Sequence, residues 1–153
     1  MQTLADRFDA AEGGVITFEG RELRRDLRMP VQSDTTFVVE FLKSTSRPVQ
    51  GLGLKAKNCS LVVTGTKGRS IGLWTDTAPR RVEVRVENVR TDAVIRFFNQ
   101  WRDEKYGSTM YHLNNAAMEI DQQPDGSFVL KCSDGWSSPN FEDLVVRIAQ
   151  ASS

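Results

Sequence analysis

Cysteine and histidine are scarce in this chain, which holds two cysteines, Cys59 and Cys132, and a single histidine, His112. These three residues cannot supply the four ligands of a structural zinc site, so we expect no bound metal. Both cysteines lie in strand-like segments far apart in the sequence, and in a reducing compartment we expect small buried hydrophobic residues rather than a disulfide. Chemistry that needs an imidazole as a base depends on His112 alone.

Long apolar runs are also missing. No stretch approaches the roughly 20 apolar residues that cross a bilayer, and the start of the chain, MQTLADRFDA, lacks the apolar segment of a secretory signal. We therefore expect a soluble, cytoplasmic protein without a membrane partner.

Motifs that bind nucleotides or cofactors are not complete anywhere in the chain. Residues 65–70, GTKGRS, lack the glycine spacing and the following helix of a phosphate loop, so we interpret them as a hairpin turn. Gly51-Leu52-Gly53 lacks the third glycine of a dinucleotide fingerprint. We expect no cofactor, and no residue is singled out as catalytic.

Positive charge is concentrated in the middle of the chain. Residues 43–96 carry 11 Lys and Arg against 4 Asp and Glu, whereas residues 1–42 carry 5 against 8 and residues 97–153 carry 4 against 8. The basic segment could form a patch for an anionic partner, or its strands could lie beside acidic ones in the fold. Because the basic residues are spread singly along strands, nucleic acid is not an expected partner.

The sequence does contain a strand pattern over most of its 153 residues, with no linker or repeat. Hydrophobic residues make up 39% of the chain. Residues 82–87 alternate valine with charged residues, as in a strand with one face toward the core and one face toward solvent. The valines are Val82, Val84 and Val86. Pro124-Asp125-Gly126 is typical of a hairpin turn. Candidate strands cover residues 15–19, 35–43, 49–55, 59–65, 69–75, 81–88, 93–101, 109–114, 117–121 and 127–133.

The two ends of the chain are less uniform. Residues 3–11 predict a short helix with Thr3 as its cap and Leu4 and Phe8 on one face, so residues 1–12 form a helix or a flexible segment. The tail, FEDLVVRIAQ, has mixed spacing, and its β-branched residues favour a strand. We predict one all-β domain over residues 1–153, an antiparallel β-sandwich that is jelly-roll-like, with a short N-terminal helix.

Aromatic and amide side chains gather in the C-terminal third. Flat rings beside amide groups are typical of surfaces that bind sugars or peptides. The alternative is that the tryptophans fill the ends of the core, since large aromatic residues are usually buried. The tentative ligand-binding residues are Trp101, Tyr106, Tyr111, His112, Asn114 and Trp136.

Several short segments together resemble a known group of proteins. They are residues 71–79, IGLWTDTAP, then Asn99-Gln100-Trp101, residues 114–118, NNAAM, Asp134-Gly135, and residues 141–145, FEDLV. The chain resembles a group of small bacterial β-sandwich proteins with W-x-D-x-A-P, N-x-W and F-[DE]-D-L-V signatures. The resemblance implies a fold and no known activity.

We therefore expect a non-catalytic binding module whose ligand is a glycan or a protein. One alternative is a self-assembling structural protein, a homo-oligomer formed through sheet edges. Another is a hydrolase acting on a glycan or an ester, with His112 or a carboxylate pair that includes Asp134 and Asp143 as acid or base.

Overall fold

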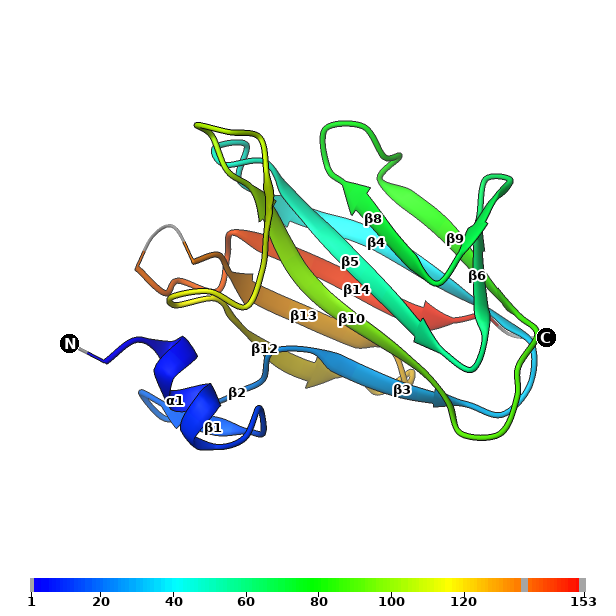
Figure 1. The fold of residues 1–153 in the computed structure, drawn as a ribbon, viewed down its shortest axis with the longest axis horizontal. Helices are drawn as coiled ribbons and strands as arrows, with labels where there is room; N and C mark the ends of the chain where they lie inside the picture. The colour runs from blue at the N-terminus through cyan, green and yellow to red at the C-terminus, as the bar shows by residue number, and fades with distance from the viewer. Residues whose placement is uncertain (1, 136–137, 152–153) are drawn as a thin grey trace.

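The computed structural model describes residues 2–135 and 138–151, which form two large packed antiparallel sheets and a small two-stranded sheet near the N-terminus (Figure 1). No helix in this part of the chain is long and apolar enough to span a membrane. The elements are α1 (Leu4–Ala10), β1 (Ile16–Phe18), β2 (Arg21–Leu23), β3 (Leu27–Val31), β4 (Thr35–Ser44), β5 (Gln50–Lys57), β6 (Ser60–Val63), β7 (Thr66–Gly68), β8 (Ser70–Trp74), β9 (Arg81–Glu87), β10 (Ala93–Arg102), β11 (Thr109–Met110), β12 (Ala117–Gln122), β13 (Phe128–Ser133) and β14 (Leu144–Gln150).

The two sheets divide the strands unequally. One sheet has the order β11-β10-β5-β8, with β3 also paired to β10, and the other has the order β12-β13-β14-β4-β9-β6-β7. Between β4 and β10 the chain crosses repeatedly from one sheet to the other, and β12, β13 and β14 then follow one another in the larger sheet. The predicted all-β antiparallel sandwich with a short N-terminal helix is confirmed.

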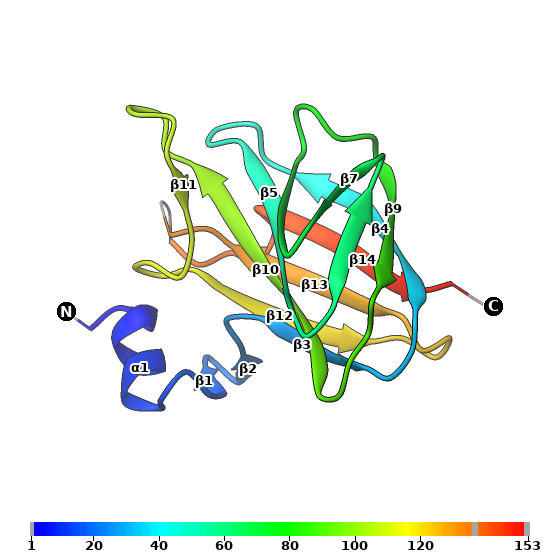
Figure 2. The ribbon, with the colours of Figure 1, turned by 45° about the vertical axis from the view of Figure 1, so that its right-hand side comes forward.

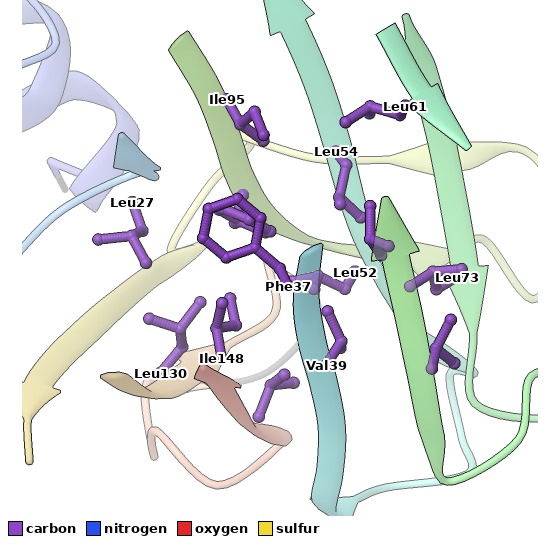
Figure 3. Packing of buried hydrophobic residues seen from close by; sticks show 14 of the residues in the cluster. Leu27, Phe37, Val39, Leu52, Leu54, Leu61, Leu73, Ile95, Leu130 and Ile148 are labelled. Carbon is purple, nitrogen blue, oxygen red and sulfur yellow. The ribbon is translucent and has the colours of Figure 1, made fainter. Parts of the chain in front are cut away.

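The core lies between the sheets because the inward-facing positions of the strands are mostly apolar. On β9, Val82, Val84 and Val86 are buried while Glu83 and Arg85 are exposed. Figure 3 shows side chains from both layers meeting in one apolar cluster. Its labelled members include Phe37, Val39, Leu52, Leu54, Leu61, Ile95, Leu130 and Ile148.

A second, smaller cluster attaches the N-terminal unit to one end of the sandwich, away from the C-terminus (Figures 1 and 2). The helix α1 begins with a capping box, in which Thr3 Oγ1 accepts from the Asp6 N–H and the Asp6 carboxylate accepts from the Thr3 N–H. Leu4 and Phe8 from α1 pack with Leu23 and neighbouring apolar residues. The predicted helix and its cap are confirmed.

Most predicted strands are present, and the tail is the strand β14, in which Leu144, Val146 and Ile148 are buried. The strand predicted over residues 109–114 is wrong beyond β11, because His112 and Asn114 take positive φ angles of 54° and 50°. The pattern does not reveal β2, β3 or β7. The strand β3 contains Pro30, which lacks a backbone N–H and is tolerated because β3 pairs only with β10.

Candidate functional site

Three glycines occupy neighbouring outward positions on two strands of the smaller sheet. Leu52 and Leu54 of β5 point into the core, so Gly51 and Gly53 face outward. Gly53 lies opposite Gly72 of β8, and Gly51 lies opposite Trp74. Since glycine has no side chain, neighbouring side chains can lie close to the backbone over these two adjacent strands.

Three side chains occupy the space that the glycines leave open. A methyl group on Gly53 would lie 2.5 Å from Cζ of Phe98, and one on Gly51 would lie 2.8 Å from Cε3 of Trp74. A methyl group on Gly72 would lie 2.8 Å from Nε2 of Gln100. These distances are too short for a Cβ, so a side chain at Gly51 or Gly53 would have to displace an aromatic ring, whereas at Gly72 the end of the flexible Gln100 side chain would have to move. We call this surface the glycine face and define it by Gly51, Gly53, Gly72, Trp74, Phe98 and Gln100.

A second layer covers part of the glycine face. The Tyr111 ring centroid lies 5.2 Å from that of Phe98, and the His112 centroid lies 5.6 Å from it. Lys55 Nζ stands 4.9 Å from the Tyr111 ring centroid and 3.4 Å from its hydroxyl oxygen. Phe98 is therefore enclosed, although it points away from the sandwich core.

Positive charge surrounds the glycine face. The Arg102 guanidinium carbon lies 4.6 Å from the Trp74 ring centroid, and its Nη1 lies 2.9 Å from Asp76 Oδ2. Arg96 faces Asp26 at 3.9 Å. Within the described part of the chain, Lys55 has no carboxylate partner. The face therefore carries a net positive charge that favours a negative or electron-rich ligand.

The carboxamide of Gln100 is the polar centre of the glycine face. Gln100 is 5% exposed, and its side chain has no hydrogen-bond partner among residues 2–135 and 138–151. The indole Nε1 of Trp74 lies beside it, 3.6 Å from the position of a methyl group on Gly72. The Gln100 carboxamide is not fully enclosed and keeps contact with solvent. Buried polar groups normally have a partner.

Two of the residues predicted from the sequence, Tyr111 and His112, belong to this region. Tyr111 is 39% exposed and offers one side of its ring to solvent. Among the residues that the structure describes, no group forms a hydrogen bond with the fully enclosed Nε2 of His112. Burial, helped by the charge of Arg25, lowers the pKa of His112 below its usual value. His112 therefore supports the packing of Phe98 and does not present a base to solvent.

Trp101 and Asn114 lie elsewhere, at the end of the sandwich. Trp101 is 3% exposed, and a methyl group on Gly135 would lie 2.7 Å from its Cη2. Asn114 Nδ2 donates to the Gly135 carbonyl at 3.4 Å. These residues hold the loop after β13, so their roles are explained by packing. Tyr106, 75% exposed on the loop between β10 and β11, joins neither group, and Trp136 lies outside the described residues.

The carboxylates Asp134 and Asp143 come together, as the hydrolase alternative requires, but they are enclosed at 1% and 3% exposure. Asp143 Oδ2 accepts from the Asp134 N–H at 2.9 Å, and Gln50 Nε2 donates to Asp134 Oδ2 at 2.8 Å. Burial raises the pKa of Asp143, opposed by its hydrogen bonds from Asp134 and Asn140. The pair ties β13 to the segment before β14 and does not meet solvent.

A groove of about 580 Å³ lies between the end of α1, the β2–β3 corner and β12. Two of its three arginines face carboxylates of the same groove, with Arg24 3.8 Å from Glu22 and Arg28 3.4 Å from Asp26. The third, Arg25, lies 3.1 Å from Asp9. These internal ion pairs leave little net charge for a ligand. Residues 2–135 and 138–151 contain no cluster of three acidic, histidine or cysteine side chains that could hold a metal ion.

Sequence reasoning missed Lys55, Phe98, Gln100 and Arg102. The available signal was the outward position of Gly51 and Gly53 on a strand whose alternate residues are leucine. That signal has meaning only once the register brings Gly72, Phe98 and Gln100 beside them. The chain matches no protein-family model, no curated protein and no solved structure.

Proposed function

We propose that this protein is a non-catalytic binding module and that the glycine face is its binding surface. The observation that supports this most is the Gln100 carboxamide, which lies almost enclosed over two glycines and beside the Trp74 indole N–H. A carboxamide donates and accepts hydrogen bonds, and an indole N–H donates only. A ligand with oxygen acceptors, a glycan or a protein segment, would accept hydrogen bonds from both groups in place of water.

The cations around the face contribute attraction over a longer range. Lys55, Arg96 and Arg102 lie on the outward side of β5 and β10, which makes electrostatic steering of an electron-rich ligand effective at low salt. Tyr111 adds an exposed ring at the margin, where apolar contact and a hydroxyl are both available. We also propose a cytoplasmic location, because Cys59 and Cys132 are both buried free thiols.

The test is a thermal-unfolding screen against a panel of glycans and of acidic, neutral and basic peptides. A ligand at 100 times its Kd stabilises the native state by about 2.7 kcal/mol, and each kcal/mol raises the midpoint of a domain of this size by about 2–4 °C. Two tyrosines serve as a matched pair. Tyr111→Ala should abolish the shift, whereas Tyr106→Ala should leave it unchanged, because Tyr106 lies on the loop between β10 and β11.

A ligand whose shift depends on Tyr106 and not on Tyr111 would contradict the proposed surface. Tryptophan fluorescence gives an independent readout, since Trp74 belongs to the glycine face. We expect a ligand-induced change in emission that is lost in Trp74→Phe. A change retained in that variant would place the ligand elsewhere.

Self-assembly is a second proposal, supported by the position of β8 at the end of its sheet. Light scattering over a range of protein concentrations tests it. A mass that rises with concentration supports a homo-oligomer, and a constant monomer mass contradicts it.

A further inference from the structure

The strand β8 ends the smaller sheet, and its register shows which backbone groups are open. The Thr75 N–H donates to the Gln50 carbonyl and the Ala56 N–H donates to the Arg69 carbonyl. In an antiparallel pair the hydrogen-bonded positions alternate. The N–H and C=O groups of Ser70 and Gly72 therefore point away from β5, toward the free edge.

The edge is accessible as well as unpaired. Ser70 and Gly72 are both exposed, and within the described residues β8 pairs with no strand other than β5. In Figure 1, β8 lies beside β5 at the upper margin of its layer. An extended segment added here would extend the sheet by one strand, with main-chain hydrogen bonds to Gly72.

The side chain opposite Gly72 on such an added strand has a defined position. Directly opposite residues share one face of the sheet, with Cβ atoms about 4.5–5.5 Å apart. That side chain would lie over the glycine face, where Gln100 Nε2 and Trp74 Nε1 are 2.8 Å and 3.6 Å from the point that a Gly72 methyl would occupy. Both nitrogens carry hydrogens to donate, so the chemistry suits an acceptor.

Positive charge near the β8 edge favours an acidic hydrogen-bond acceptor over a neutral one. Residues 69–80, which are β8 and its flanks, carry two Arg and one Asp. The guanidinium of Arg102 covers Trp74 on the same face. A carboxylate that accepts from the indole and carboxamide N–H groups would form charge-assisted hydrogen bonds, which are stronger than neutral ones.

We propose that the β8 edge takes up an extended acidic segment of a partner protein by strand addition, with an aspartate or glutamate of that segment placed over Gly72. The inference rests on the proposed function, since it names the ligand class of the glycine face. Gln100 and Trp74 would bind the carboxylate, and the backbone of Ser70 and Gly72 would hold the added strand.

The probe is a capped seven-residue peptide in which threonine and valine alternate around a central glutamate. The control peptide is identical except that glutamine replaces the central glutamate. Binding is followed by Trp74 fluorescence and by amide NMR shifts up to millimolar peptide. We expect the glutamate peptide to bind at least about tenfold more tightly than the glutamine peptide, and the difference to disappear in Trp74→Phe and in Gln100→Met, which keeps the side-chain length.

A second variant tests the strand addition itself. Ser70→Pro removes a backbone N–H that points to the free edge and leaves the pairing with β5 intact, so it should abolish binding of both peptides. Arg102→Gln removes a positive charge beside Trp74 and should weaken binding of the glutamate peptide. Arg81→Gln removes a positive charge from the other sheet and serves as its control, so it should leave binding unchanged. Thermal unfolding confirms that each variant is folded.

Several results would overturn the inference. They are no binding of the glutamate peptide at millimolar concentration, equal binding of both peptides, and binding that Ser70→Pro leaves unchanged. Self-association that Ser70→Pro abolishes, without peptide binding, would assign the edge to a second copy of this chain. A ligand from the panel that depends on Tyr111 and not on Ser70 would overturn strand addition while supporting the proposed function.

Discussion

The substitution Gly53→Ala tests whether the glycine face is built as described. The new methyl group would lie 2.5 Å from Cζ of Phe98 and 2.9 Å from Oε1 of Gln100. The Phe98 ring cannot simply withdraw, because Tyr111 and His112 flank it. Alanine for glycine stabilises through the unfolded chain by about 0.4–1 kcal/mol, but overpacking costs about 1–3 kcal/mol, so we expect net destabilisation.

Thermal unfolding measures this change, with a midpoint shift of about 2–4 °C for each kcal/mol. The control is Gly68→Ala on β7, where the nearest atoms to a new methyl would be 4.0 Å away. We expect the control to be neutral or slightly stabilising. If Gly53→Ala is as stable as Gly68→Ala, the packing of Phe98 on Gly53 is wrong.

A double-mutant cycle isolates the contact. Phe98→Leu removes part of the ring and should cost stability alone, yet it should relieve the clash of Gly53→Ala. Residues in contact show interaction energies of about 0.5–3 kcal/mol. We expect the double variant to be more stable than the sum of the single effects predicts. Strict additivity would mean that residue 53 and the Phe98 ring are not in contact.

Three further predictions concern the residues around the face and the end of the sandwich. Burial lowers the pKa of His112, so the unfolded state binds the proton more tightly and the free energy of unfolding should fall as pH drops below the ordinary value of 6.5. Denaturant titrations at several pH values measure this dependence, which His112→Gln should remove. A dependence that persists in the variant would exclude His112 as its cause. Burial raises the pKa of Asp143, so the free energy of unfolding should fall as pH rises above 3.8 toward the raised value. Asp143→Asn should flatten that part of the stability–pH profile. An unchanged profile would contradict the burial of this carboxyl group. Trp101→Ala should cost about 3–5 kcal/mol in chemical denaturation because the ring is enclosed, whereas a loss under 1 kcal/mol would mean that the ring is a surface group.

The sandwich could be predicted because strands such as β9 alternate apolar and charged residues. The buried valines of β9 and the Pro124-Asp125-Gly126 turn between β12 and β13 are local signals, and the structure confirms both. The short edge strands could not be predicted, since β3 contains a proline and pairs with β10, far along the chain. Pairing of this kind is decided by tertiary packing, which propensity does not report.

The candidate site was predicted only in part for a similar reason. Aromatic and amide enrichment led to Tyr111 and His112, which lie beside Phe98, but the same criterion selected Trp101 and Asn114, which hold the loop after β13. Sequence enrichment does not distinguish the two faces of a sheet. That distinction depends on register, and a shift of one residue reverses the face of every side chain.

The most direct test of the glycine face is an amide NMR titration of the isotope-labelled protein with each compound that raises the thermal midpoint in the screen. We expect the largest shifts on the amides of Gly51, Gly53 and Gly72 and on the indole N–H of Trp74. Shifts confined to the groove near Arg24, or to the loop that carries Tyr106, would contradict this expectation.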